Sequence, residues 1–271
     1  MGKIRLIALD VDGTLLDDQK RLPPAHREAL EEAASRGILI AIASGRMTPT
    51  IEPIQDLLGI DCILIAYNGA RVLGSRRERR ALITHCPLPA DVAGVFIEFS
   101  REREYLLNFY HEDRLYAEGG PRRLPFIEIY SRRTGARYEI VDDLSRFRKV
   151  APTKLILLSS PEERDRFHDE FRAALRERAF ITKSDPEYLE VMAPGVDKGT
   201  ALDLVAKHYG IPLEEVMAVG DAENDIGMLR MAGLGVAMQN APPHVKDAAR
   251  VVTEESNNEG GVAGAIRRWA L

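Results

Sequence analysis

A mostly apolar run near the start of this chain ends in two carboxylates. Residues Ile4–Leu9 lead directly into Asp10-Val11-Asp12-Gly13-Thr14. A short buried run of this kind is typical of a strand covered on both faces of a parallel sheet, and open α/β sheets bind ligands where such strands end. Two buried carboxylates need compensation, so we expect a cation or a shared proton beside them. An Asp-x-Asp can also serve only as a turn, so the rest of the chain has to decide.

Two further apolar runs end in polar turns. Ile38–Ala43 is followed by Ser44 and Gly45, and Val216–Val219 is followed by Gly220 and Asp221. Segments with helical spacing separate these runs, which predicts an α/β fold with a doubly wound, parallel, Rossmann-like sheet. Because parallel strands end on one edge of such a sheet, we expect Asp10, Ser44 and Asp221 to converge there.

The central part of the chain has a different pattern. Short segments alternate with polar residues from about residue 84, and the α/β pattern resumes near residue 188. We predict a core domain made of residues 1–83 and 188–271, with a smaller α+β domain inserted as residues 84–187. The inserted domain is expected to contain antiparallel strands, at Leu106–Tyr110, Ile127–Tyr130 and Leu155–Leu158.

The converging residues supply the groups that phosphoryl transfer requires. Asp10 can attack phosphorus as a carboxylate and form an aspartyl-phosphate. Asp12 can protonate the leaving alcohol and then take a proton from the hydrolytic water, for which we expect a raised pKa. Asp221, Asp10 and a backbone carbonyl offer the hard oxygen ligands that Mg²⁺ prefers.

Other polar residues near the expected site suit a phosphate group. Ser44 can donate its hydroxyl, with a backbone amide near Gly45, to a phosphate oxygen. Lys198 offers a compact ammonium at the start of a helix, and Asn224 could reach phosphate or substrate. Asp225 could orient Lys198 or metal-bound water. Each has an ordinary alternative: a helix cap for Ser44, a solvated surface lysine, and a helix N-terminal acid for Asp225.

Together these segments resemble the four motifs of the haloacid dehalogenase (HAD) superfamily. The motifs are Asp10-x-Asp12-Gly-Thr, Ser44 after a buried strand, Lys198 before Gly199, and Gly220-Asp221-x-x-Asn224-Asp225. The insertion between the second and third motifs is similar to that of the Cof-like branch with a type C2 (C2B) cap. The resemblance implies that Asp10 is the nucleophile and Asp12 the acid/base. It also implies that Asp10, the main-chain carbonyl of Asp12, and Asp221 bind Mg²⁺, while Ser44 and Lys198 contact phosphate.

The expected function is a Mg²⁺-dependent phosphatase of a small phosphorylated metabolite, such as a sugar phosphate, with the cap closing over the substrate. One alternative is a phosphomutase that resembles the phosphomannomutases. The other is a phospho-aspartate switch that resembles response-regulator receivers, although Asp12 and the large insertion argue against it. True dehalogenases carry a different residue at the position of Asp12, so dehalogenation is not expected.

The composition indicates which partners and which location to expect for the protein. A net charge of −5 argues against a dedicated nucleic-acid or membrane-surface partner, and the arginine-rich run 76–80 is expected to be solvated. No apolar stretch approaches the ~20 residues of a membrane span. We expect a cytoplasmic protein, as a monomer or a homodimer. The two cysteines, Cys62 and Cys86, do not suggest a disulfide framework or a zinc site.

Overall fold

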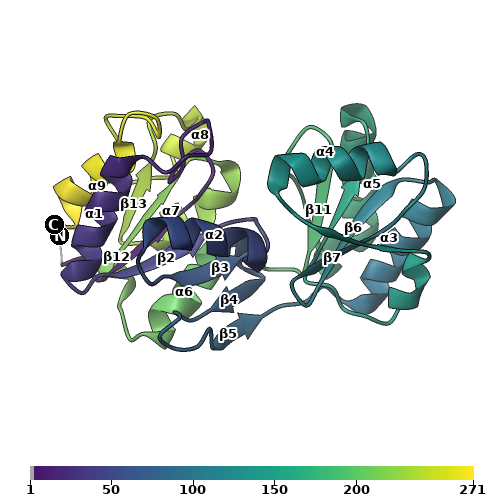
Figure 1. Ribbon diagram of the computed structural model, residues 1–271, viewed down its shortest axis with the longest axis horizontal. Helices are drawn as coiled ribbons and strands as arrows, with labels where there is room; N and C mark the ends of the chain where they lie inside the picture. The colour runs from purple at the N-terminus through teal and green to yellow at the C-terminus, as the bar shows by residue number, and fades with distance from the viewer. Residues whose placement is uncertain (1–2) are drawn as a thin grey trace. The chain divides into compact units, whose positions relative to one another are not determined.

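A computed structural model describes residues 3–271 of the chain. It contains two compact units, one formed by Met1–Thr84 with Asp197–Leu271 and the other by His85–Val196 (Figure 1). The second unit therefore continues to Val196, beyond the boundary expected at residue 187. The reason is strand β11 (Tyr188–Met192), which pairs antiparallel with strands of the second unit.

The first unit is built on an eight-stranded sheet with the order β14-β13-β12-β1-β2-β3-β4-β5. Its strands are β1 (Leu6–Leu9), β2 (Leu39–Ala43), β3 (Ile63–Ala66), β4 (Arg71–Leu73), β5 (Leu82–His85), β12 (Val216–Gly220), β13 (Leu234–Ala237) and β14 (Val251–Val252). The six strands from β14 to β3 run parallel, and β4 turns back antiparallel to β3. A tight turn at Tyr67–Gly69 joins β3 to β4.

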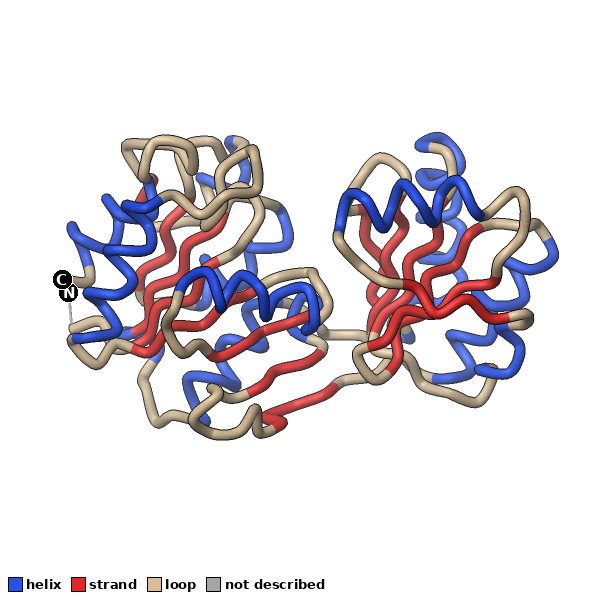
Figure 2. The backbone as a smooth tube through the Cα atoms, in the orientation of Figure 1, coloured by secondary structure: helices blue, strands red, loops and turns tan. Residues whose placement is uncertain are grey.

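Helices cover both faces of this sheet (Figure 2). They are α1 (Pro24–Ser35), α2 (Thr48–Leu58), α6 (Lys198–His208), α7 (Ile226–Met231), α8 (Pro243–Lys246) and α9 (Gly261–Trp269), with 3₁₀ turns η1 (Tyr67–Gly69), η4 (Leu213–Glu215) and η5 (Glu223–Asp225). Small and branched side chains of the strands pack against α6 and α7 in one buried cluster. The predicted fold class, a doubly wound α/β sheet, is confirmed.

The second unit has a six-stranded sheet with the order β10-β11-β9-β6-β7-β8. Its elements are β6 (Leu106–His111), β7 (Arg114–Glu118), β8 (Tyr138–Val141), β9 (Lys154–Leu158), β10 (Phe180–Lys183), β11, α3 (Ala90–Glu102), α4 (Leu124–Thr134), α5 (Pro161–Leu175), η2 (Leu144–Phe147) and η3 (Arg176–Arg178). The strand expected at Ile127–Tyr130 is wrong, because these residues lie in α4. Its two buried residues, Ile127 and Tyr130, have the spacing of a helix, whereas Ile127-Glu128-Ile129 alternates as a strand does.

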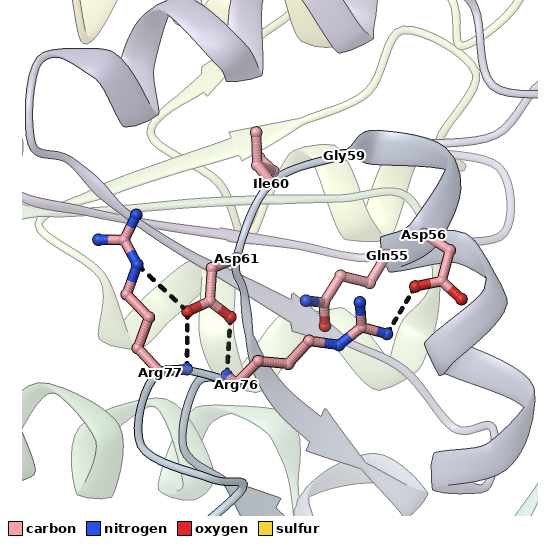
Figure 3. Close-up of a pocket in the computed structure, with 7 residues that line it drawn as sticks. All are labelled: Gln55, Asp56, Gly59, Ile60, Asp61, Arg76 and Arg77. Atoms are coloured by element: carbon pink, nitrogen blue, oxygen red, sulfur yellow. Dashed lines mark hydrogen bonds and ion pairs between the residues drawn. The ribbon is translucent and has the colours of Figure 1, made fainter.

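The arginine-rich run forms a turn between β4 and β5 beside a surface pocket of about 350 Å³ (Figure 3). The backbone N–H groups of Arg76 and Arg77 donate to the Asp61 carboxylate, at 2.7 and 3.1 Å. The Arg76 guanidinium also donates to Asp56, at 2.6 Å. The charged groups of this pocket are therefore largely paired with one another. Across residues 3–271, the helices are too short or too polar to cross a membrane.

Candidate functional site

Three neighbouring parallel strands bring the predicted polar residues to one edge of the sheet. Strand β1 lies between β12 and β2, with Leu9 level with Val219 on one side and Ile42 on the other. Asp10, Asp221 and Ser44 follow these three strands directly. These three residues therefore converge at one edge of the sheet, as expected from the sequence.

The centre of the site is a cluster of three carboxylates. Asp10, Asp221 and Asp225 each offer a carboxylate oxygen, and the three oxygens lie within 4.8 Å of one another. Burial, together with the charge of Asp225, raises the pKa of Asp10 well above its ordinary value and raises that of Asp221 to about 6. The Thr14 hydroxyl donates to Asp221 at 2.7 Å, which lowers the pKa of that carboxyl in part. The cluster carries more negative charge than its surroundings neutralise.

Lys198 supplies one positive charge from within the cluster. It is the first residue of α6 and is completely buried, and its Nζ donates to Asp10 and to Asp225, both at 2.6 Å. Burial alone would lower the pKa of Lys198, but the two carboxylates outweigh burial and raise it. Lys198 therefore stays charged and is not a solvated surface lysine. One ammonium among three carboxylates leaves an excess of negative charge that suits a divalent cation with oxygen ligands.

Asp225 also shapes the turn that carries Asp221. Its second oxygen accepts hydrogen bonds from the backbone N–H groups of Asp221 and Ala222, at 3.0 and 2.9 Å. Both oxygens of Asp225 are thus engaged by Lys198 and by the turn. Asp10 and Asp221 are the better candidates for metal ligands, because the described residues engage each of them at one oxygen only.

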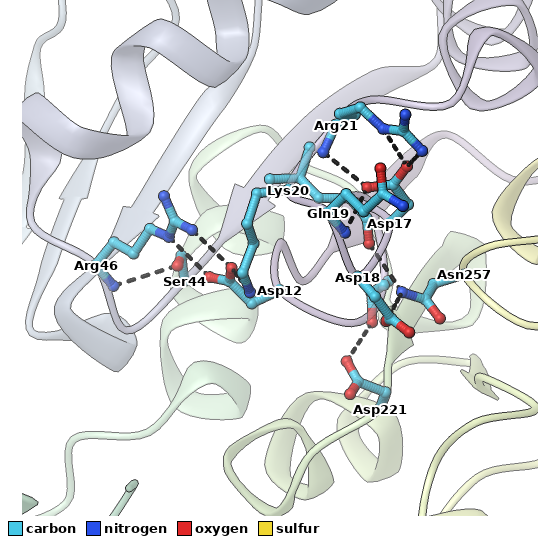
Figure 4. A network of polar contacts seen from close by, with 12 residues as sticks. Asp12, Asp17, Asp18, Gln19, Lys20, Arg21, Ser44, Arg46, Asp221 and Asn257 are labelled. Atoms are coloured by element: carbon cyan, nitrogen blue, oxygen red, sulfur yellow. Dashed lines mark hydrogen bonds and ion pairs between the residues drawn. The ribbon is translucent and has the colours of Figure 1, made fainter. Parts of the chain in front are cut away.

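Asp12 is held apart from this cluster by two cations. Arg46 donates through Nε to Oδ2 at 2.7 Å and through Nη2 to Oδ1 at 2.6 Å, and Lys20 donates to Oδ1 at 2.7 Å (Figure 4). Burial raises the pKa of Asp12, but Arg46 and Lys20 outweigh burial and lower it below its ordinary value. The expectation of a raised pKa for Asp12 is therefore wrong. Its carboxylate is engaged by these cations, and its main-chain carbonyl is the group that the resemblance implies as a metal ligand.

Apart from Lys198, the residues expected at the phosphate form a second group around Asn68. Ser44 is buried, its hydroxyl accepts from the Arg46 N–H at 3.2 Å, and its carbonyl accepts from the Asn68 N–H at 2.9 Å. Asn224 donates to the Asn68 side chain at 2.9 Å. Gly45 lies against the same side chain, since a Cβ on Gly45 would be 2.9 Å from Asn68 Oδ1. Asn68 therefore links the turns after β2, β3 and β12.

Sequence reasoning missed four residues of this site as candidate site residues. Arg46 and Asn68 had a usable signal, because Arg46 directly follows Ser44 and Gly45, and Asn68 forms the turn after a buried strand. Thr14 had a partial signal, because it belongs to the motif that begins at Asp10. Lys20 had no signal, because it reaches Asp12 only through the loop that follows β1.

Comparisons with known proteins show the family to which the chain is similar. A family model described as haloacid dehalogenase-like hydrolase matches residues 7–266. The chain is 32% identical to the 5-amino-6-(5-phospho-D-ribitylamino)uracil phosphatase YcsE of Bacillus subtilis (strain 168), over 99% of this chain and 96% of that protein. A haloacid dehalogenase-like hydrolase from Bacteroides thetaiotaomicron has a similar structure, with a TM-score of 0.89, 29% identity, and coverage of 98% and 99%. The HAD subclass IIB sugar phosphatase BT4131 is also similar, with a TM-score of 0.83, 27% identity, and coverage of 97% and 98%.

Proposed function

This chain belongs to the haloacid dehalogenase-like hydrolases, among their Cof-like phosphatases, and on that premise we propose that it hydrolyses small phosphomonoesters with Mg²⁺ through an aspartyl-phosphate. Sugar phosphates and similar metabolites are the proposed substrates. The observation that carries the proposal is the cluster of Asp10, Asp221 and Asp225 around the buried Lys198. Such a cluster can hold a divalent cation beside a carboxylate nucleophile.

The proposed reaction has two half-reactions. In the first, Asp10 attacks phosphorus, the bond to the leaving oxygen breaks, and Asp12, in the protonated form that this step requires, supplies a proton to that oxygen. In the second, water attacks the aspartyl-phosphate, Asp12 takes its proton, and the Asp10 carboxylate is released. When bound by Asp10, Asp221 and the Asp12 carbonyl, Mg²⁺ would offset the negative charge of the phosphate. Lys198 favours the ionised form of Asp10, since its charge and its hydrogen bond both lower the pKa of Asp10 against the larger effect of burial.

The second unit, residues 85–196, is proposed to select the substrate, as the resemblance to capped relatives implies. The two named phosphatases above act on a phosphorylated ribitylaminouracil and on sugar phosphates, which supports a small phosphorylated metabolite here. The oligomeric state, the cytoplasmic location and the absence of nucleic-acid or membrane partners stay predictions.

A phosphate-release screen over a panel of phosphorylated metabolites tests this proposal. With Mg²⁺ present we expect turnover of at least one phosphomonoester, at a kcat in the ordinary range of about 1–10³ s⁻¹. EDTA should stop the reaction and Mg²⁺ should restore it. Full activity in EDTA would refute the metal requirement. Conversion of a hexose 1-phosphate to its 6-phosphate without free phosphate would instead favour the mutase alternative.

The raised pKa of Asp221 leads to a prediction about the stability of the protein. Because the folded pKa of Asp221 is raised to about 6, its protonated form favours the folded state, and that contribution is lost as pH rises through about 6. At pH 7.5 without Mg²⁺, Asp221→Asn should therefore raise the melting temperature, by about 2–5 °C. The gain should shrink at pH 4.5. Mg²⁺ should stabilise the wild type and have little effect on the variant.

Glu223→Gln is the matched control, because Glu223 is exposed in the same turn. It should leave both the melting temperature and the Mg²⁺ response unchanged. Melting curves at the two pH values, with and without Mg²⁺, check all of these outcomes. An Asp221→Asn protein that is stabilised by Mg²⁺ as strongly as the wild type would remove Asp221 from the metal site.

A further inference from the structure

Arg46 holds Asp12 from a rigid position. Its guanidinium makes the two-point contact that is characteristic of Arg with a carboxylate, and its side chain is only 25% exposed. Its backbone N–H donates to the Ser44 hydroxyl, and its carbonyl accepts from the Tyr67 N–H at 3.0 Å. The residue is thus anchored on both sides in the turn after β2, and it fixes the plane of the Asp12 carboxylate.

Lys20 contacts the same carboxylate from a well-defined loop (Figure 4). The Asp17 side chain accepts from the backbone N–H groups of Gln19 and Arg21, both at 2.9 Å, and so closes the loop around Lys20. The Lys20 side chain is 59% exposed, whereas Arg46 is mostly covered. Arg46 is therefore the inner support of Asp12, and Lys20 is the outer one.

These contacts occupy most of the lone-pair directions of the Asp12 carboxylate. A carboxylate has about four lone-pair directions, two on each oxygen. Oδ1 accepts from Lys20 and Arg46, and Oδ2 accepts from Arg46. Among the contacts of the described residues, one direction on Oδ2 remains for a further donor. A carboxylate held in this way is arranged to receive a proton.

We propose that Arg46 is a positioning residue for the hydrolytic half-reaction, in which it holds Asp12 as the base for the attacking water. This inference rests on the proposed phosphatase function. The water oxygen forms a bond to phosphorus, and the bond between phosphorus and the Asp10 oxygen breaks. The electron pair of that bond returns to the Asp10 carboxylate, and the water proton goes to Oδ2 of Asp12.

Arg46→Gln tests this role with p-nitrophenyl phosphate, whose good leaving group makes the first half-reaction less dependent on an acid. If the variant loses the orientation of Asp12, hydrolysis of the aspartyl-phosphate becomes rate-limiting. We expect kcat to fall about 10–100-fold, as for misplaced catalytic groups in general. KM should fall with it, so that kcat/KM stays within about threefold. Rapid mixing should show a burst of about one p-nitrophenol per active site, and acid quenching should trap a phosphoryl group on Asp10.

A matched control is Arg21→Gln, because Arg21 pairs with Asp17 in the same loop and, among the described residues, has no hydrogen bond or ion pair with Asp12. Its kcat and KM should stay within about twofold of the wild type, with no burst. Arg46→Lys keeps the charge without the two-point contact and should give an intermediate kcat. Melting curves of the variants show whether they fold.

Several outcomes would overturn the role of Arg46. One is a raised KM with unchanged kcat, which would make Arg46 a phosphate contact. Another is a lowered kcat/KM without a burst, which would make its effect structural or place it in the first half-reaction. If the wild type itself releases no phosphate from any substrate, the proposed function fails, and this result is distinct from a failure of Arg46 alone.

Discussion

Asp10→Asn should abolish phosphate release while the protein stays folded. The amide is neutral and cannot serve as a carboxylate nucleophile, so we expect kcat to fall by at least about 10⁴-fold, the scale seen when a covalent nucleophile is removed. The amide oxygen can still accept a hydrogen bond from Lys198, whose Nζ lies 2.6 Å from Asp10 Oδ1. Because burial raises the pKa of Asp10, removing its charge should not destabilise the fold.

The measurement combines steady-state phosphate release with melting curves and acid-quenched phosphoprotein. Asp203→Asn is a suitable control, since Asp203 pairs with Lys207 on helix α6 outside the carboxylate cluster. It should retain full activity. An Asp10→Asn protein with more than about one hundredth of the wild-type kcat, measured free of deamidated protein, would remove Asp10 as the nucleophile.

The strands of the core and their shared edge could be predicted from the sequence, because both depend on local patterns. The run Ile38–Ala43 contains β2, and Val216–Val219 lies within β12. Buried parallel strands are apolar throughout, and their carboxyl ends lie together by topology. Asp10 and Asp221 could therefore be expected in one place without knowledge of any side-chain conformation.

The charge state of Asp12 could not be predicted in the same way. It depends on Arg46 and Lys20, which lie in different loops, and side-chain contacts between loops leave no periodic signal in the sequence. The expectation of a raised pKa counted only the neighbouring carboxylates and burial. In the structure, burial does raise the pKa of Asp12, but Arg46 and Lys20 together lower it by more.

The second unit was harder to predict for a related reason. Its sheet mixes antiparallel and parallel pairs, and strands β7 and β8 lack the continuously buried pattern of the core strands. Helix α4 carries only two buried residues, Ile127 and Tyr130, and its weak pattern is also compatible with a strand. The sequence predicts the boundary between the two units near residue 187 instead of 196, because β11 is fully buried like the strands of the core.

The largest stability effect is expected from Lys198→Met. This change leaves the buried Asp10 and Asp225 carboxylates without the ammonium that pairs with both. Removing one partner of a buried ion pair costs about 3–5 kcal/mol, because the remaining charge stays uncompensated. For a protein of this size the melting temperature should fall by roughly 6–20 °C. Activity should be lost as well, since the same ammonium orients Asp10.

Lys207→Met is the control for Lys198→Met, because it removes a different lysine of the same helix, α6. Lys207 also donates to a carboxylate at 2.6 Å, that of Asp203, but its side chain is 70% exposed. Exposed ion pairs contribute about 0–1 kcal/mol, so this variant should melt within about 3 °C of the wild type. Equal melting temperatures for the two variants would show that the buried ammonium does not stabilise the site.

Two further measurements connect the loss of stability to the uncompensated carboxylates. Lys198 is the group that lowers the pKa of Asp10, so in Lys198→Met that pKa should rise further and Asp10 should bind a proton more readily. The deficit in melting temperature should therefore become smaller as the pH is lowered from 7.5 toward 5. A second substitution, Asp225→Asn, should recover part of the deficit at pH 7.5, because it removes one of the two unpaired charges. If the deficit in melting temperature changes with neither the pH nor the second substitution, lost packing of the lysine side chain, and not the unpaired charge, causes it.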